Sequence, residues 1–145
     1  MKFSVCIDMM FAHHDFENRI AAVKKTGMEA VEFWKWTNKD IDLVCRQLSD
    51  NKMDFAIFNI DCADEKLSYD LSRGILNAGR KKELLAALKE SAPIYKKLSA
   101  EAMIVLVGET IEGMSREKQI ENVYECLSYV KDFAEEEGIT LIVEP

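Results

Sequence analysis

The sequence contains no long apolar run. None of its hydrophobic stretches approaches the roughly 20 residues that a helix needs to cross a bilayer, which excludes a membrane-spanning protein. The apolar stretch at the amino terminus is short and is interrupted by Asp8, a pattern that favours a strand over a secretory signal peptide. We therefore expect a cytoplasmic protein that does not associate with membranes.

Closely spaced cysteines are also missing. The four cysteines, Cys6, Cys45, Cys62 and Cys126, include no pair with CxxC spacing, so the sequence indicates neither a zinc site nor a redox motif. A protein without an export signal keeps its thiols reduced, and free cysteines are commonly buried. We predict four reduced thiols in packing positions.

Positive charge is in short supply. Nineteen basic residues face 26 acidic ones, and the formal net charge is −7. An acidic surface repels the phosphate backbone, so a nucleic-acid-binding protein with a broad basic face is disfavoured. The one basic cluster, 80–82, is followed by Glu83 and is typical of a solvated first turn of a helix. A small-molecule substrate is the remaining expectation.

Short apolar runs alternate with longer amphipathic segments along the chain, which predicts parallel strands joined by helices. Pro93 lies inside the third predicted helix, so we expect a kink or break near Ser91. The polar segment 62–79 is long for a connection, and long loops are often functional. The predicted strands are 2–8, 30–34, 54–61, 102–107 and 139–144, and the predicted helices are 15–26, 39–50, 80–98 and 115–138.

Two α/β architectures fit this alternation: an open doubly wound sheet and the first part of an eight-stranded barrel. Glycine is absent from 8–12, where a dinucleotide-binding fold carries its phosphate loop, so the open sheet is disfavoured. Five strands do not close a barrel of the usual length of about 250 residues. We predict a single domain over 1–145 that forms an incomplete parallel (β/α) barrel of TIM type.

In such a barrel, ligands bind at the carboxyl ends of the strands. Side chains alternate along a strand, so Glu32, Trp34 and Trp36 are predicted to share the face toward the barrel axis, with Val31 and Phe33 toward the helices. A buried salt bridge explains Glu32 equally well, and core filling explains both tryptophans. The alternative, which we adopt as the prediction, is that all three line a substrate pocket.

Further polar side chains end the third and fifth predicted strands. Asn59 and Asp61 share a face, and they either orient substrate hydroxyls or satisfy the following loop; Asn59 is our fourth predicted substrate-binding residue. Leu141 and Val143 are expected to pack against helices, which leaves Glu144 inward. A carboxylate there is costly unless it is paired, binds a cation or is simply solvated at the chain end. Adjacent histidines, such as the pair at 13–14, rarely direct both side chains to one ion, so the pair is not predicted to bind metal.

Several segments carry a resemblance to a known family. The chain resembles the hydroxypyruvate isomerase family, a branch of the xylose isomerase-like (AP endonuclease family 2) TIM barrels, over essentially all of its 145 residues. The resemblance covers only about the first half of the family's barrel. The sequence departs from the family pattern at Ser99, where a glycine usually ends the third helix, and at Pro93 within that helix. The segments that carry it, in order, are KFSVCID (2–8), AVEFWKW (30–36), KES (89–91), KKL (96–98) and GITLIVEP (138–145).

The resemblance implies a role for Glu144. In this family a glutamate that ends strand five is a ligand of a divalent metal and lies close to the proton-transfer chemistry, so Glu144 becomes the predicted catalytic and metal-binding residue. The family's other metal ligands lie on strands six to eight, outside these residues. The implied reaction is isomerisation of hydroxypyruvate, or a related 2-oxo acid or sugar, through an enediolate. Its cofactor would be a cation of the Mg²⁺ or Mn²⁺ class.

Because hard cations take about six oxygen ligands and one carboxylate cannot shuttle the proton alone, we expect this chain by itself to be inactive. Three alternatives remain. A sugar epimerase or an endonuclease-IV-like phosphodiesterase could use the same scaffold, although the acidic charge speaks against the nuclease. A non-catalytic half-barrel could instead serve assembly. Open strand edges template association, so we expect a homo-oligomer.

Overall fold

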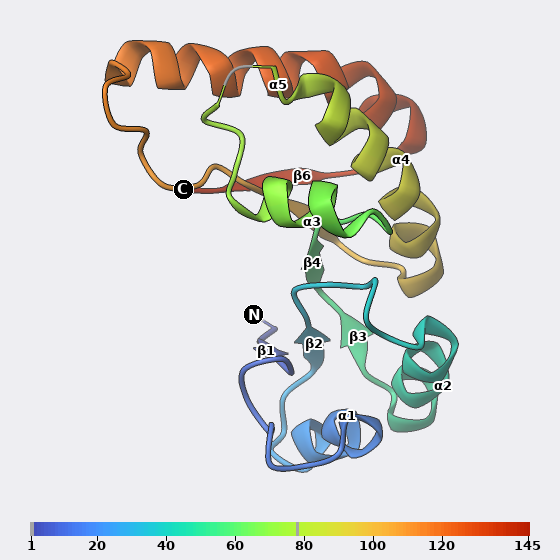
Figure 1. Ribbon diagram of the computed structural model, residues 1–145. Helices are drawn as coiled ribbons and strands as arrows, with labels where there is room; N and C mark the ends of the chain where they lie inside the picture. Colours follow the sequence, from blue (N-terminus) through green and yellow to red (C-terminus); the bar gives the residue numbers. More distant parts are fainter. Residues whose placement is uncertain (1, 78) are drawn as a thin grey trace.

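The strands of the protein form one parallel arc. The computed structural model describes residues 2–77 and 79–145. β1 (Ser4–Cys6), β2 (Ala30–Glu32) and β3 (Asp54–Phe55) form one parallel sheet in that order. β4 (Ile57–Asn59), β5 (Ala102–Leu106) and β6 (Leu141–Glu144) form a second. Figure 1 shows the strands along the inside of an arc and α1, α2, α4 and α5 along its outside. The alternation predicted from the sequence is confirmed.

The predicted third strand is broken at Ala56. Ala56 N–H donates to the carbonyl of Val31 in the first sheet at 2.9 Å. Its carbonyl accepts from the N–H of Glu101, the residue before β5 of the second sheet, also at 2.9 Å. Phe55 and Phe58 are both buried although they are three residues apart, a spacing that regular alternation does not allow. The irregular residue therefore joins the two sheets and keeps both rings in the core, and the prediction of one strand over 54–61 is wrong at this point.

The helices begin and end close to their predicted positions. α2 (Ile41–Asn51) is capped by Asp40, whose carboxylate accepts from the N–H of Leu43, and α5 (Arg116–Glu137) is capped by Ser115. α1 spans Phe16–Lys24. The predicted connection 62–79 holds an additional helix, α3 (Glu65–Ser72), which Asp64 caps. This helix has only eight residues, fewer than the window over which apolar periodicity distinguishes a helix from a loop.

α4 (Lys81–Leu98) continues through Pro93, so the predicted break near Ser91 does not occur. Pro93 removes the donor to the carbonyl of Lys89, but both residues are exposed, and water can bond to that carbonyl instead. The opposite side of the helix is packed through Ala87, Leu88 and Ala92. α4 ends at Ser99 with φ +51°, a left-handed conformation that glycine adopts most easily.

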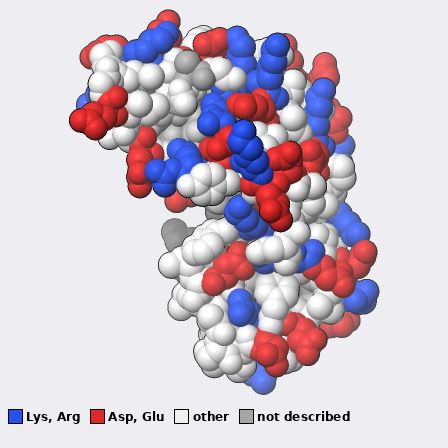
Figure 2. All heavy atoms as spheres, viewed as in Figure 1, with Lys and Arg blue, Asp and Glu red and all other residues white. Residues whose placement is uncertain are grey.

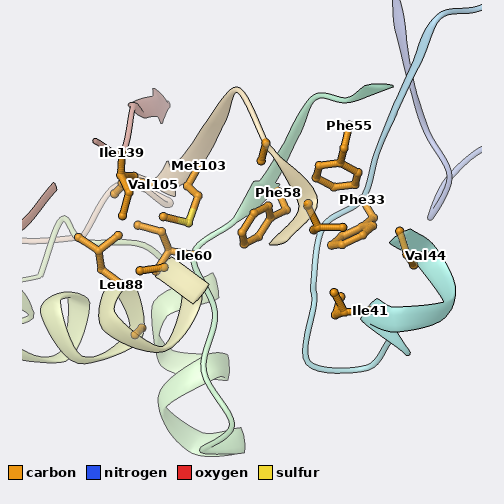
Figure 3. Close-up of a cluster of buried hydrophobic side chains, with 14 of the residues drawn as sticks. Phe33, Ile41, Val44, Phe55, Phe58, Ile60, Leu88, Met103, Val105 and Ile139 are labelled. Atoms are coloured by element: carbon orange, nitrogen blue, oxygen red, sulfur yellow. The ribbon is translucent and has the colours of Figure 1, made fainter. Parts of the chain in front are cut away.

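The core lies between the arc of strands and the helices. Phe33, Phe55 and Phe58 pack together with ring centroids 4.7 to 6.1 Å apart (Figure 3). Val31 and Phe33 are buried, which confirms that they face the helices. Figure 3 also shows Leu88 of α4 beside Met103 and Val105 of β5 and beside Ile139, which precedes β6.

The inner face of the arc is largely uncovered. Trp34 is 48% exposed and Ile142 39% exposed. Val143 was expected to pack against helices, but it is 46% exposed because, in the described chain, the helices near β6 cover Leu141 and do not reach it. Figure 2 shows the molecule hollowed at the left, on the open side of the arc, with acidic and basic side chains mixed over the visible face. No helix in the described parts of the chain is long and apolar enough to cross a membrane.

Candidate active site at the carboxyl ends of the strands

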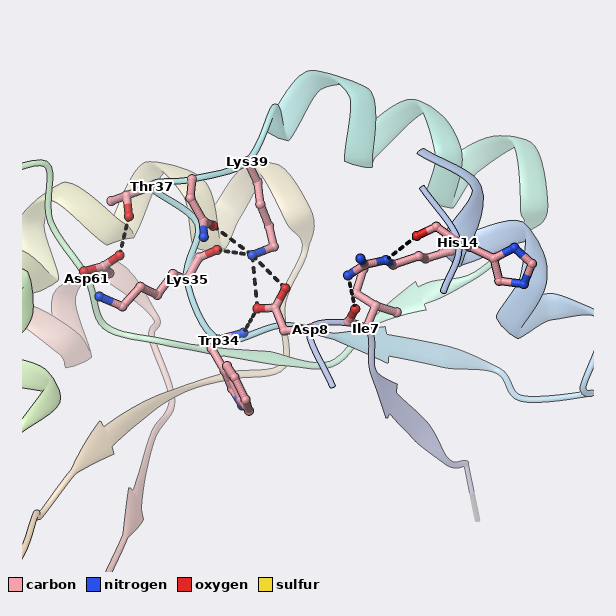
Figure 4. Close-up of polar contacts among 10 residues, drawn as sticks. Ile7, Asp8, His14, Trp34, Lys35, Thr37, Lys39 and Asp61 are labelled. Atoms are coloured by element: carbon pink, nitrogen blue, oxygen red, sulfur yellow. Dashed lines mark hydrogen bonds and ion pairs between the residues drawn. The ribbon is translucent and has the colours of Figure 1, made fainter. Parts of the chain in front are cut away.

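A buried ion pair joins the ends of the first two strands. The ammonium of Lys39 lies 3.0 Å from Asp8, and the Lys39 side chain is only 3% exposed. Its Nζ also donates to the carbonyl of Lys35 at 2.8 Å, and Asp8 accepts the N–H of Trp34 at 2.8 Å (Figure 4). The ammonium further lies 4.7 Å from the ring centroid of Phe33. Such a satisfied buried pair fixes the loop after β1 against the loop after β2.

Asp61 is occupied by structural contacts. Thr37 Oγ1 donates to its carboxylate at 2.6 Å, and Ser91 Oγ of α4 donates to its carbonyl at 2.8 Å. Trp36 Nε1 donates to the same Ser91 hydroxyl at 3.0 Å. Trp36 therefore packs against α4 and not beside Trp34 toward the barrel axis. The predicted common face is wrong because β2 ends at Glu32, and the alternation of a strand no longer applies four residues later.

The other three predicted substrate-binding residues face the inner side. Glu32 is half-buried and accepts a hydrogen bond from the hydroxyl of Ser4 on the neighbouring strand. The indole of Trp34 points away from the Asp8–Lys39 pair in Figure 4. Asn59 has a buried side-chain oxygen without a hydrogen-bond partner among the described residues. An unsatisfied buried acceptor is costly, so the Asn59 side chain is a polar group at this strand end whose partner the described residues do not supply.

A pocket of about 440 Å³ lies between the loop after β2 and α3. Its lining includes Cys62 and Lys35, and Lys35 donates a hydrogen bond to Ser68 at 2.8 Å. Burial raises the pKa of the Cys62 thiol, which holds it neutral. All four cysteines are free, and Cys62 and Cys126 are buried.

Glu144 ends β6 at a pocket of about 280 Å³. Its carbonyl accepts from the N–H of Val107 at 2.9 Å, which extends the ladder between β5 and β6 to its last residue. The side chain is exposed and lines the pocket together with Arg73 and Glu109, which form an ion pair at 3.2 Å. Sequence reasoning missed this pair because neither residue lies in a periodic segment.

Two glycines press the loop after α3 against the end of β5. Gly74 and Gly108 have φ of +90° and +92°, and a Cβ at Gly74 would lie 2.0 Å from the carbonyl oxygen of Val107. The N–H of Ile75 donates to that same oxygen at 2.9 Å. Only glycine permits both this conformation and this contact. The positions of Arg73 and Glu109 are therefore fixed at the backbone by adjacent glycines.

The described residues do not hold a complete metal site. Within 2–77 and 79–145, no three His, Cys, Asp or Glu side chains gather closely enough to bind an ion. The rings of the two histidines at 13–14 lie 4.2 Å apart, and Arg19 binds the carbonyl of His14. Glu144 and Glu109 line one pocket, but two carboxylates fall short of the ligand number of a hard cation.

Comparison with known proteins decides the family. Residues 20–145 match the family described as the xylose isomerase-like TIM barrel. The chain belongs to this family. Hydroxypyruvate isomerase of Escherichia coli strain K12 is 27% identical over 146 aligned residues, which cover the whole chain and 55% of that enzyme. The xylose isomerase-like chain described here thus spans about half the length of the curated relative that it matches.

Solved structures agree with this assignment. An AP endonuclease, family 2, from Brucella melitensis superposes with a TM-score of 0.83 at 25% identity, over 99% of this chain and 55% of the other. The IOLI protein, solved with a bound zinc atom, superposes with a TM-score of 0.72 at 14% identity, over 99% and 51% of the two chains. The protein therefore has the fold of about half of a TIM barrel, and one structural relative binds a metal.

Proposed function

We propose that this chain supplies the first half of the active site of a metal-dependent isomerase that acts on hydroxypyruvate or a related small 2-oxo acid or sugar. The observation that carries the proposal is the position of Glu144, whose carboxylate lies at the carboxyl end of β6 in a pocket of about 280 Å³. Ligands of parallel barrels bind at this end. The similarity to a hydroxypyruvate isomerase along the whole chain supports the choice of substrate.

In the proposed reaction, a proton leaves C3 of hydroxypyruvate and another is delivered to C2, which gives tartronate semialdehyde through an enediolate. A divalent cation of the Mg²⁺ or Mn²⁺ class would supply polarisation of the carbonyl, and Glu144 would be one of its oxygen ligands. The residues described here do not complete that ligand set, so the remaining ligands would come from the second half of a barrel. The free acceptor of Asn59 and the exposed ring of Trp34 would orient the substrate.

A chimera tests this proposal. Residues 1–145 would replace the matching first half of the Escherichia coli enzyme, to which they align over their whole length. We expect the folded chimera to isomerise hydroxypyruvate with Mg²⁺ or Mn²⁺, and Glu144→Gln to abolish turnover. Glu136→Gln is the matched control, because Glu136 is an exposed residue of α5 outside the pocket. Equal turnover in the Glu144→Gln and parent chimeras would overturn the proposal.

A second enzymatic candidate is a sugar epimerase. A sugar phosphate isomerase/epimerase from Parabacteroides distasonis superposes with a TM-score of 0.67 at 11% identity, which supports the shared scaffold and not the substrate. Screening the chimera against sugars and 2-oxo acids separates the two activities.

The non-catalytic candidate is an assembly domain. The exposed side chains of the inner face, Trp34 and Ile142, favour burial against a second copy of this chain. A chimera that folds but neither binds metal nor turns over any substrate would favour this candidate.

A further inference from the structure

The pocket that contains Glu144 also holds an arginine whose role the proposed isomerisation leaves open. Among the described residues that line the pocket, Arg73 alone carries a positive charge, whereas Glu109 and Glu144 are acidic. Arg73 follows the last residue of α3, and its side chain is 59% exposed. Arginine is the side chain best suited to bind a carboxylate, because its planar donors pair with two oxygens at once.

The backbone holds Arg73 rigidly at this position. The carbonyl of Arg73 lies against Gly108, where an added Cβ would come within 2.0 Å of it, and the N–H of Gly74 closes the end of α3 on Leu71 at 2.9 Å. The exposed side chain can thus change rotamer while the backbone of Arg73 stays fixed at the rim of the pocket. A fixed backbone position places the guanidinium within reach of a ligand.

Arg73 already holds a carboxylate in this structure. Its Nη2 lies 3.2 Å from Oε2 of Glu109, whose side chain is 85% exposed. An ion pair between two exposed side chains contributes little to stability, so another carboxylate can displace Glu109. Arg80 lacks this freedom, because its side chain is 19% exposed and lies between Asp70 at 3.2 Å and Glu83 at 3.5 Å.

We infer that Arg73 binds the carboxylate of the substrate, and that Glu109 occupies this place when no substrate is bound. The inference rests on the proposed function and adds its substrate class: an α-keto or hydroxy acid is preferred over a neutral sugar of the same size. The preference arises because a neutral ligand would leave Arg73 paired with Glu109 and gain nothing from displacing it. The carboxylate of Glu109, which pairs with Arg73, occupies the position that we assign to the substrate carboxylate.

Binding to the 145-residue chain, followed by NMR of ¹⁵N-labelled protein, tests this assignment without turnover. Hydroxypyruvate is compared with dihydroxyacetone, which replaces its carboxylate by a neutral hydroxymethyl group, and with dihydroxyacetone phosphate. We expect hydroxypyruvate to shift the signals of Gly74, Gly108 and Glu109 saturably and to bind more tightly than either of the other ligands. Arg73→Gln should weaken it by about tenfold or more, the loss typical of a charged hydrogen bond.

Two variants sharpen the test. Glu109→Gln removes the competing carboxylate and should tighten hydroxypyruvate binding roughly twofold to fivefold, the range of an exposed pair. Arg46→Gln removes an exposed arginine of α2, outside this pocket, and should leave binding unchanged.

The assignment would be overturned by equal binding of hydroxypyruvate and dihydroxyacetone, by equal effects of Arg73→Gln and Arg46→Gln, or by no shift at the three reporter signals. Tighter binding of the phosphate would assign the site to phosphate and would likewise overturn the carboxylate. Failure of the proposed function can be distinguished from failure of this assignment. In the former case the chimera does not turn over hydroxypyruvate, but Arg73 still binds its carboxylate.

Discussion

Replacement of Lys39 by methionine should markedly destabilise the chain. The Lys39 side chain is 3% exposed, and its partner Asp8 is 17% exposed, so the pair lies in a largely dry environment. Removal of one partner from a buried pair costs about 3–5 kcal/mol, because the other charge stays buried without compensation. In the variant, Asp8 still accepts the hydrogen bond from the N–H of Trp34, and the methionine side chain still packs on Phe33. We therefore expect the free energy of unfolding to fall by about 2–4 kcal/mol.

Urea unfolding measures this loss. With a slope of about 2 kcal/mol per molar urea, in the middle of the range for small proteins, the midpoint should fall by about 1–2 M. Lys96→Met is the matched control, since Lys96 pairs with Glu137 at the surface and its removal should cost less than about 1 kcal/mol. In a double-mutant cycle, Asp8→Asn combined with Lys39→Met should destabilise by less than the sum of the two changes. Equal midpoints for Lys39→Met and Lys96→Met would refute the reasoning.

Four other outcomes are expected. Gly74→Ala should lower the free energy of unfolding by more than Gly79→Ala. Both glycines have φ near +90°, but of the two only Gly74 has a backbone oxygen where the added Cβ would lie. Equal losses of unfolding free energy, measured by urea unfolding, would contradict the close contact of Gly74 with the end of β5. Burial raises the pKa of the Cys126 thiol, so the unfolded chain loses this proton at a lower pH than the folded chain does. The free energy of unfolding should therefore fall as pH rises above about 8.5, and it should fall less in Cys126→Ala. A difference in stability between the parent and Cys126→Ala that does not change with pH would argue against this effect of burial. The isolated chain should show no hydroxypyruvate isomerisation with Mg²⁺ or Mn²⁺, and saturable turnover that disappears in Glu144→Gln would contradict this. We also propose that the chain associates through its open edges or inner face, so sedimentation at micromolar concentration should give a dimer or larger species; a folded monomer of 16.6 kDa would exclude it.

The parts of the fold that periodicity encodes could be predicted from the sequence. Val31 and Phe33 face the helices as alternation requires. α5 lies within one residue of its predicted bounds because Ser115 caps its start and Gly138, with φ +67°, ends it. α3 was missed because it has only eight residues, fewer than the window over which apolar periodicity identifies a helix. The irregularity at Ala56 was missed because it depends on hydrogen bonds to both neighbouring strands, which are set by tertiary structure.

The candidate site was predictable only where it coincides with strand ends. Glu144 and Asn59 could be placed because they end apolar strands, and Glu144 gained its role through the family resemblance. Trp36 was misplaced because the strand rule was extended beyond the end of β2. The Lys39–Asp8 and Arg73–Glu109 pairs join residues 31 and 36 positions apart, and nothing in the local sequence links such partners.

Proton exchange with solvent tests most directly whether Glu144 serves an enediolate isomerisation. The chimera and hydroxypyruvate would be incubated in D₂O with Mg²⁺ or Mn²⁺, and loss of the C3 proton signal would be followed by NMR. Exchange well above the uncatalysed rate is expected for the parent and for Glu136→Gln, and exchange at the uncatalysed rate for Glu144→Gln. A folded parent chimera that does not accelerate exchange, or a Glu144→Gln chimera that still does, would contradict the assignment of this carboxylate.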